Sequence, residues 1–205
     1  MARWSAQKRA EARARILEAA RAEFEAEGFE GAKMRRIAAE AGLAVGTLFN
    51  YFPDKRALLY GALYEDLEGV KSGCVASMPG AEEGLEALLV HTAGYFFDYY
   101  AQRPALSRTL LKESLWAGGQ DAEVFRAQVR QLGHALVGRM EAMQGLGLLD
   151  AQASPHVVGM AFFSHYYFVL MLLSEEGFDP ARGRQLVGMM ARQLVLGVGV
   201  KRDSV

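Results

Sequence analysis

Residues 16–59, ILEAARAEFEAEGFEGAKMRRIAAEAGLAVGTLFNYFPDKRALL, decide the fold of this chain. Their apolar positions recur every three or four residues, which is the period of an amphipathic helix. The pattern predicts a first helix that stops at Gly28, a short second helix that ends at Gly42, and a short third helix over about 45–52. Two short helices joined by a tight turn and packed under a longer helix form a helix-turn-helix.

The turn between the second and third helices comprises Ala41, Gly42 and Leu43. Glycine can adopt the left-handed backbone conformation that ends one helix and directs the chain into the next. The small side chains of Ala38 and Ala39 let the two helices approach each other. The space between these helices is expected to be filled by Ile37, Leu43, Leu48 and Phe52.

Helical periodicity continues through the rest of the chain, and no segment shows the alternation that indicates a strand. Pro53 and Asp54 interrupt the pattern, and Asp54 suits the N-cap of a long fourth helix. Turn-forming segments separate five more helices, over about 82–101, 104–117, 121–144, 155–175 and 180–199. The prediction is an all-α fold of about nine helices with a domain boundary after residue 53.

Composition argues for a folded protein whose positive charge lies near the N-terminus. The chain has 205 residues, of which 51% are hydrophobic, and this is enough apolar material for a buried core. Its net charge is −1, but residues 1–56 carry 11 Lys and Arg against 8 Asp and Glu, whereas residues 57–205 carry 12 against 16. The N-terminal part is therefore the expected partner of a polyanion.

Several features indicate the cytoplasm. The single cysteine, Cys74, cannot form an intrachain disulfide, which suits a reducing compartment. The N-terminus lacks the apolar run of a signal peptide, and the most apolar stretch, residues 161–173, is too short to cross a bilayer. We expect a cytoplasmic protein that does not contact membranes.

The quoted stretch resembles the N-terminal signature of the TetR (tetracycline repressor) family over 44 consecutive residues without a gap. The resemblance implies nine helices, of which the first three bind DNA and the last two form a four-helix homodimer interface. It assigns a helix-turn-helix DNA-binding domain to residues 1–53 and an effector-binding and dimerisation domain to residues 54–205. The expected partner is double-stranded operator DNA with a palindromic sequence, bound by the dimer.

The resemblance also implies individual DNA contacts. The backbone near Gly46 and Thr47 would approach DNA, while Tyr51 and Lys55 would each reach a phosphate. Asn50 lies at a variable position of the recognition helix and can pair with adenine N6 and N7, so it is the expected base reader. The predicted DNA-binding residues are Lys33, Arg35, Arg36, Val45, Gly46, Thr47, Asn50, Tyr51 and Lys55.

The chain departs from the family pattern at three positions of this domain. Lys33 and Ala44 stand where Ser or Thr often precedes the second and third helices, so both helices lack a side-chain cap. Phe49 stands where Tyr is common and cannot donate a hydrogen bond to a phosphate.

A basic N-terminal arm that enters a minor groove, or an unstructured tail, is expected from Arg3, Lys8, Arg9, Arg13 and Arg15. Arg35 and Arg36 are equally compatible with solvated surface charges.

The remaining sequence is rich in aromatic residues on two helices, which can line a cavity for an apolar effector or simply form the core. Four cations on the intervening helices can receive an anionic head, such as the phosphates of a fatty acyl-coenzyme A, or can be solvated surface charges. His165 can hydrogen-bond a ligand or serve at an interface. The candidate ligand-binding residues are Phe96, Phe97, Tyr100, Arg108, Lys112, Arg126, Arg130, Phe163, His165 and Tyr166.

The sequence thus predicts a ligand-responsive transcriptional repressor rather than an enzyme. It shows no nucleophile with its base, no metal-ligand set and no dinucleotide fingerprint, so neither catalysis nor a cofactor is expected. The alternatives are a regulator of an efflux system that senses aromatic or cationic drugs, and a helical adaptor that does not bind DNA. The predicted dimer contacts are Gly159, Met160, Phe163, Tyr167, Leu170, Leu186, Val187, Met190, Leu194 and Val198.

Overall fold

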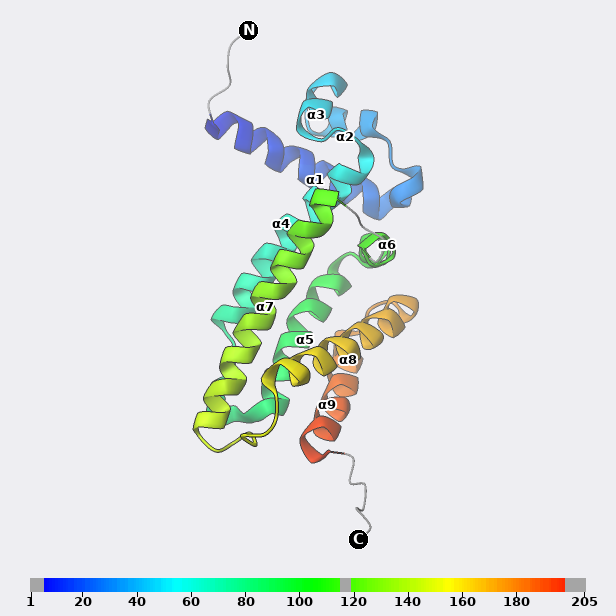
Figure 1. Cartoon of the computed structure of the whole chain (residues 1–205). Coiled ribbons are helices and arrows are strands. Elements are labelled where there is room, and N and C mark those ends of the chain that lie inside the picture. The colour runs from blue at the N-terminus through cyan, green and yellow to red at the C-terminus, as the bar shows by residue number, and fades with distance from the viewer. Residues whose placement is uncertain (1–5, 115–118, 198–205) are drawn as a thin grey trace. The chain divides into compact units, whose positions relative to one another are not determined.

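The computed structural model describes residues 6–114 and 119–197, and across these residues the protein is helical without strands (Figure 1). This confirms the predicted all-α fold. The described helices are α1 (Ala6–Gly31), α2 (Met34–Glu40), α3 (Val45–Tyr51), α4 (Lys55–Ala76), α5 (Gly84–Gln102), α6 (Pro104–Ser114), α7 (Gly119–Gly145), α8 (Pro155–Glu176) and α9 (Pro180–Leu196). A single 3₁₀ turn, Ala81–Glu83, precedes α5.

The helices form two compact units. Unit 1 comprises Met1–Gly69 and Arg103–Arg126, and unit 2 comprises Val70–Gln102 and Ala127–Val205. The predicted helix-turn-helix therefore lies in unit 1, together with α6. The division after residue 53 stays a prediction, because α4 contributes its first part to unit 1 and its last part to unit 2.

In unit 1, α1 buries the apolar face that its sequence predicts. Ile16, Leu17 and Phe24 are fully buried. The backbone leaves the helical conformation at Gly28, where φ is 67°, so the predicted stop is confirmed as a break, after which a further turn runs to Gly31. Phe29 then folds back, and its ring centroid lies 6.0 Å from that of Phe24.

The basic residues near the N-terminus are part of α1 and do not form an arm or an unstructured tail. Lys8, Arg9, Arg13 and Arg15 are all helical, because the α1 pattern starts at Ala6; Arg3 lies outside the described residues. Arg13 pairs with Glu65 at 2.7 Å and stands 5.6 Å from the centre of the Phe52 ring.

The helix-turn-helix has the predicted turn and the predicted core. Gly42 has a φ of 68°, and the amide of Leu43 donates to the carbonyl of Ala38 at 2.9 Å. Ile37 and Leu48 are fully buried between the helices. The Phe52 ring packs over Gly61 of α4, where an added Cβ would lie only 2.5 Å from a ring carbon.

Capping follows the sequence closely. Asp54 Oδ1 accepts the amide of Ala57 at 2.8 Å and so caps α4, as predicted. Asp179 caps α9 by accepting the amides of Ala181 and Arg182. Lys33 and Ala44, at the N-caps of α2 and α3, make no side-chain cap hydrogen bond, which confirms the predicted departures.

In unit 2, α9 packs along both α5 and α8 (Figure 1). The close approach of α5 and α9 depends on Gly183. A Cβ at that position would lie 2.6 Å from a ring carbon of Phe97 and 2.8 Å from a methyl of Leu173. Arg184 pairs with Asp98, and Arg192 pairs with Glu86 at 2.7 Å, at the edges of the same contact.

One described helix, α8, is long and apolar enough to cross a membrane by length and composition alone. This criterion is weak evidence, because apolar helices of folded domains pass it as well. Only 28% of its most apolar part is buried, so α8 carries an apolar surface that the described residues leave uncovered.

The α5–α9 contact gives a stability prediction. Gly183→Ala should lower the free energy of unfolding by about 1–3 kcal/mol, because the new methyl overlaps Phe97 and Leu173 in a packed core. Gly138→Ala is the matched control: it lies in α7 with nothing within 4 Å of the added Cβ, and it should stabilise by about 0.5–1 kcal/mol. Urea denaturation measures both changes, and equal effects at the two sites would contradict this account of the packing.

Candidate DNA-binding site

The third helix has an outward and an inward face. Leu48 and Phe52 point into unit 1, with exposed fractions of 0% and 6%. Gly46, Phe49 and Asn50 are exposed, and their spacing of three and four residues places them on one face of α3. This outward face contains the predicted base reader, Asn50.

Gly46 is not required by the fold of the chain. Its φ is not positive, and a Cβ added there would meet no atom within 4 Å. The missing side chain therefore leaves the backbone open to a close approach from outside. Thr47 and Tyr51 lie beside this face and are half-buried, as is Val45 at the start of the helix.

Lys55 has a structural role that its sequence position does not reveal. Its ammonium donates to the carbonyls of Glu30 at 3.0 Å and Ala32 at 3.3 Å, and it lies 4.7 Å from the centre of the Phe29 ring. It thus ties the start of α4 to the segment after α1. An ammonium has three donors, so one remains for the phosphate contact, which stays a prediction.

Arg36 is held by two carboxylates of α1. It pairs with Glu23 at 3.1 Å and with Glu27 at 2.8 Å, and the hydrogen bond with Glu27 together with both negative charges raises the pKa of its guanidinium. The amide of Lys33 also donates to Glu23, at 3.1 Å. A phosphate contact by Arg36 would therefore compete with these ion pairs, whereas the Lys33 and Arg35 side chains are exposed.

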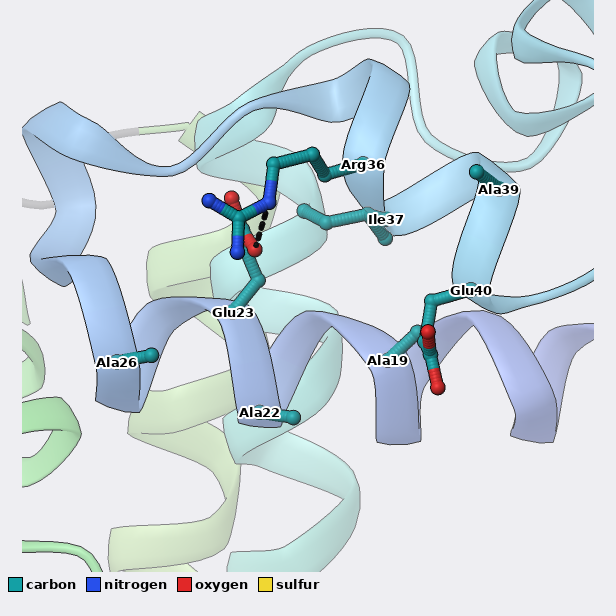
Figure 2. Close-up of a pocket in the computed structure, with 8 residues that line it drawn as sticks. All are labelled: Ala19, Ala22, Glu23, Ala26, Arg36, Ile37, Ala39 and Glu40. Carbon is teal, nitrogen blue, oxygen red and sulfur yellow. Dashed lines mark ion pairs between the residues drawn. The ribbon is translucent and has the colours of Figure 1, made fainter.

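The Arg36–Glu23 pair lies at one end of a groove of about 510 Å³ between α1 and α2 (Figure 2). The rest of the groove is lined mainly by small side chains, and Glu40 stands at its other end (Figure 2). The small alanine side chains of α1 let α2 pack closely against it. The ion pair and the groove are therefore both part of the packing between these two helices.

The predicted aromatic ligand residues do meet in unit 2, between α5 and α8. Phe97 stacks on Tyr166 with ring centroids 5.5 Å apart, and Phe96 contacts the same ring edge-on at 6.1 Å. Phe163 is half-buried beside Phe162, at 5.5 Å. The packing of Phe97 against Gly183 shows that this ring is a core residue.

Polar groups lie within this aromatic cluster. Tyr100 and Tyr166 share a hydrogen bond, and burial raises the pKa of both phenols. The half-buried His165 has a buried Nδ1 with no hydrogen-bond partner among the described residues. An interior with such groups can bind a polar function on an otherwise apolar molecule.

The four predicted cations are divided between the two units. Arg108 and Lys112 are exposed on α6, and Arg126 pairs with Glu123 at 3.2 Å; all three belong to unit 1. Arg130 is exposed in unit 2. Their role as a receptor for an anionic head stays a prediction.

Sequence reasoning missed Lys71, which is only 8% exposed and donates to the side-chain oxygen of Gln131 in unit 2. The helical pattern could have revealed it, because Lys71 follows buried Leu67 by four residues and precedes buried Cys74 by three. Burial raises the pKa of the Cys74 thiol to about 11, which keeps it protonated and unreactive at neutral pH. Across the described residues, no three His, Cys, Asp or Glu side chains are placed to hold a metal ion.

Known proteins resemble the chain in two ways. Residues 16–60 match the model of the bacterial regulatory proteins of the tetR family. The HTH-type transcriptional repressor KstR of Rhodococcus jostii is 45% identical over 62 residues, which are 30% of this chain and 29% of KstR. The chain thus spans about three tenths of the length of the curated relatives that it matches.

Solved structures extend the likeness to the whole fold. A chain from Mesorhizobium loti, described as a TetR-family transcriptional regulator, superposes with a TM-score of 0.71 at 17% identity, covering 95% of this chain and 100% of that one. Thermus thermophilus FadR, a TetR-family repressor in complex with lauroyl-CoA, gives 0.64 at 23% identity, covering 94% and 98%. Residues 16–60 of this chain therefore match the DNA-binding region of the TetR family of bacterial regulatory proteins, and the chain shares the fold of TetR-family structures.

Proposed function

We propose that this protein is a transcriptional repressor that binds a palindromic operator as a homodimer and is released by a hydrophobic effector with an anionic head. The observation that carries the proposal is the outward face of α3, where Asn50 is exposed beside a glycine that the fold does not need. Such a face suits the major groove, in which base edges carry distinct donor and acceptor patterns. Occupation of a promoter is sufficient for repression, so activation is the less direct reading.

Phosphate contacts position a protein on DNA, whereas base contacts select the sequence. Asn50 is assigned to selection. Lys33, Arg35 and the third donor of Lys55 are assigned to positioning. The hydroxyl of Tyr51 can donate a further hydrogen bond to a phosphate. Arg36 attracts phosphate less than its sequence position suggests, because the negative charges of Glu23 and Glu27 offset its positive charge.

Asn50→Ala and Lys33→Ala separate these two roles. Asn50→Ala should cost about 1–3 kcal/mol on the selected operator and little on random DNA. Lys33→Ala should weaken both DNAs alike and lower the slope of log affinity against log salt by about one. Fluorescence anisotropy at several salt concentrations measures both effects. Equal losses on operator and random DNA for Asn50→Ala would refute its role in sequence selection.

The homodimer is supported by apolar residues that the chain leaves exposed on its last two helices. On α8, Val157, Met160, Phe168 and Met171 recur at helical spacing and are 51–64% exposed. On α9, Met189, Val195 and Leu196 are at least half exposed. Leu170 and Val187, predicted as dimer contacts, are instead buried within the chain, Gly159 is buried as well, and Val198 lies outside the described residues.

Phe168→Glu should convert the dimer to a monomer, because a two-fold axis would bury the new carboxylate twice in an apolar interface. Leu148→Glu is the matched control, since Leu148 is 56% exposed in the turn after α7 and is not one of the exposed residues of α8. Sedimentation velocity at micromolar concentration gives the oligomeric state. A wild-type monomer, or equal loss of dimer in both variants, would contradict the proposed interface.

The effector is proposed to bind in unit 2. Its aromatic side chains and the tyrosine pair suit an apolar chain with a polar end, and FadR of Thermus thermophilus was solved with lauroyl-CoA. We assign the anionic head to Lys71, because it is a buried cation in the same unit as the aromatic cluster. An efflux regulator that senses aromatic or cationic drugs is the alternative.

The response is proposed to travel along α1, α4 and α6. Glu25 of α1 accepts the amides of Ala105 and Leu106 and so caps α6. Arg21 of α1 bonds the carboxylate of Asp66 and the carbonyl of Ala62 on α4. Because α4 and α6 are both hydrogen-bonded to α1, a shift of either helix would move α1, on which the helix-turn-helix packs.

Lauroyl-CoA tests this scheme. Operator DNA should weaken lauroyl-CoA binding by the same factor by which lauroyl-CoA weakens operator binding, about 5- to 150-fold. Calorimetric titration with and without operator measures both. Lys71→Met should reduce lauroyl-CoA affinity more than the exposed control Lys112→Met. A larger loss in Lys112→Met would instead assign the anionic head of lauroyl-CoA to α6. If operator DNA leaves the affinity for lauroyl-CoA unchanged, lauroyl-CoA is not the inducer.

A further inference from the structure

Phe49 is an exposed aromatic residue on the outward face of α3. Its exposed fraction is 44%, although the neighbouring positions 48 and 52 are buried in unit 1. Within the described part of the chain, its ring stacks on no other aromatic ring. The fold of unit 1 therefore leaves nearly half of this side chain accessible to an external partner.

The position of Phe49 on the helix limits what that partner can be. Asn50 is the next residue, and Gly46 lies one turn before it on the same exposed face. Since Gly46 has no side chain, a surface that approaches the backbone there meets Phe49 and Asn50 side by side. In the proposed function, that surface is the floor of the major groove.

A phenylalanine ring has neither a donor nor an acceptor, so it cannot pair with the polar edges of bases. The apolar group that the major groove presents is the C5-methyl of thymine. We propose that Phe49 is a specificity-determining residue that contacts a thymine methyl in each half-site, beside the base read by Asn50. This inference rests on the proposed function, and it adds a base preference that Asn50 alone does not supply.

The test uses the full-length protein and an operator selected from random double-stranded DNA. Each thymine of the selected site is replaced in turn by deoxyuridine, which lacks only the C5-methyl. Dissociation constants are measured for the wild type, F49A and V75A. Val75 is the matched control because it is a 39% exposed apolar residue on α4, in the unit 2 part of that helix.

At one thymine or more in each half-site, loss of the methyl should weaken the wild type about fourfold, the effect of one buried methyl group. F49A should bind more weakly than the wild type and be indifferent to that methyl, while V75A should respond as the wild type does. Unchanged binding of F49A to random DNA shows that this variant is folded.

Three results overturn the inference, and they differ in what else they refute. A selected site in which no methyl matters, or a methyl effect that F49A retains in full, refutes the role of Phe49 and leaves DNA binding intact. The wild-type scan alone can give the first of these results, so the test does not depend on the variant. A selection that recovers no sequence refutes the proposed function together with this inference.

Discussion

The contact between Arg21 and α4 is the constraint on which unit 1 depends. The Arg21 side chain is only 13% exposed, and its guanidinium donates to the carboxylate of Asp66 and to the backbone carbonyl of Ala62. A charged group with so little access to water is stable only when its donors are satisfied, and here the satisfaction comes from another helix. The contact therefore fixes α4 on α1, and α4 in turn begins directly after the recognition helix.

The two short helices of the DNA-binding site inherit their stability from this arrangement. α2 and α3 have seven residues each and no side-chain N-caps, so neither would persist as an isolated helix. Burial of Ile37 and Leu48 holds the two helices in place. Two hydrogen bonds add to this: Lys55 donates to the backbone carbonyl of Glu30, and Glu23 accepts the backbone amide of Lys33. The exposed face of α3 is consequently available for binding, because the opposite face provides the packing.

The fold could be predicted from sequence because its main signals are local. The period of apolar residues, the left-handed Gly42 and the Asp54 cap each depend on residues within one turn of the helix. The partners of Arg36, the carbonyls that hold Lys55 and the Gln131 partner of Lys71 lie 9 to 60 positions away, and the local pattern does not specify them. For the same reason the sequence before residue 16 predicts a basic arm or an unstructured tail, although Arg13 pairs with Glu65.

The composition of unit 1 has a consequence for building hybrid regulators. The simplest exchange of DNA-binding heads between relatives would be a single cut after the helix-turn-helix. In this chain, a cut after residue 53 would separate α1 from Asp66, Ala62 and the start of α6, all of which it holds by hydrogen bonds. A transplantable head would instead have to carry two pieces of chain, residues 1–69 and 103–126, or keep the matching carboxylate, carbonyl and amide partners in the recipient.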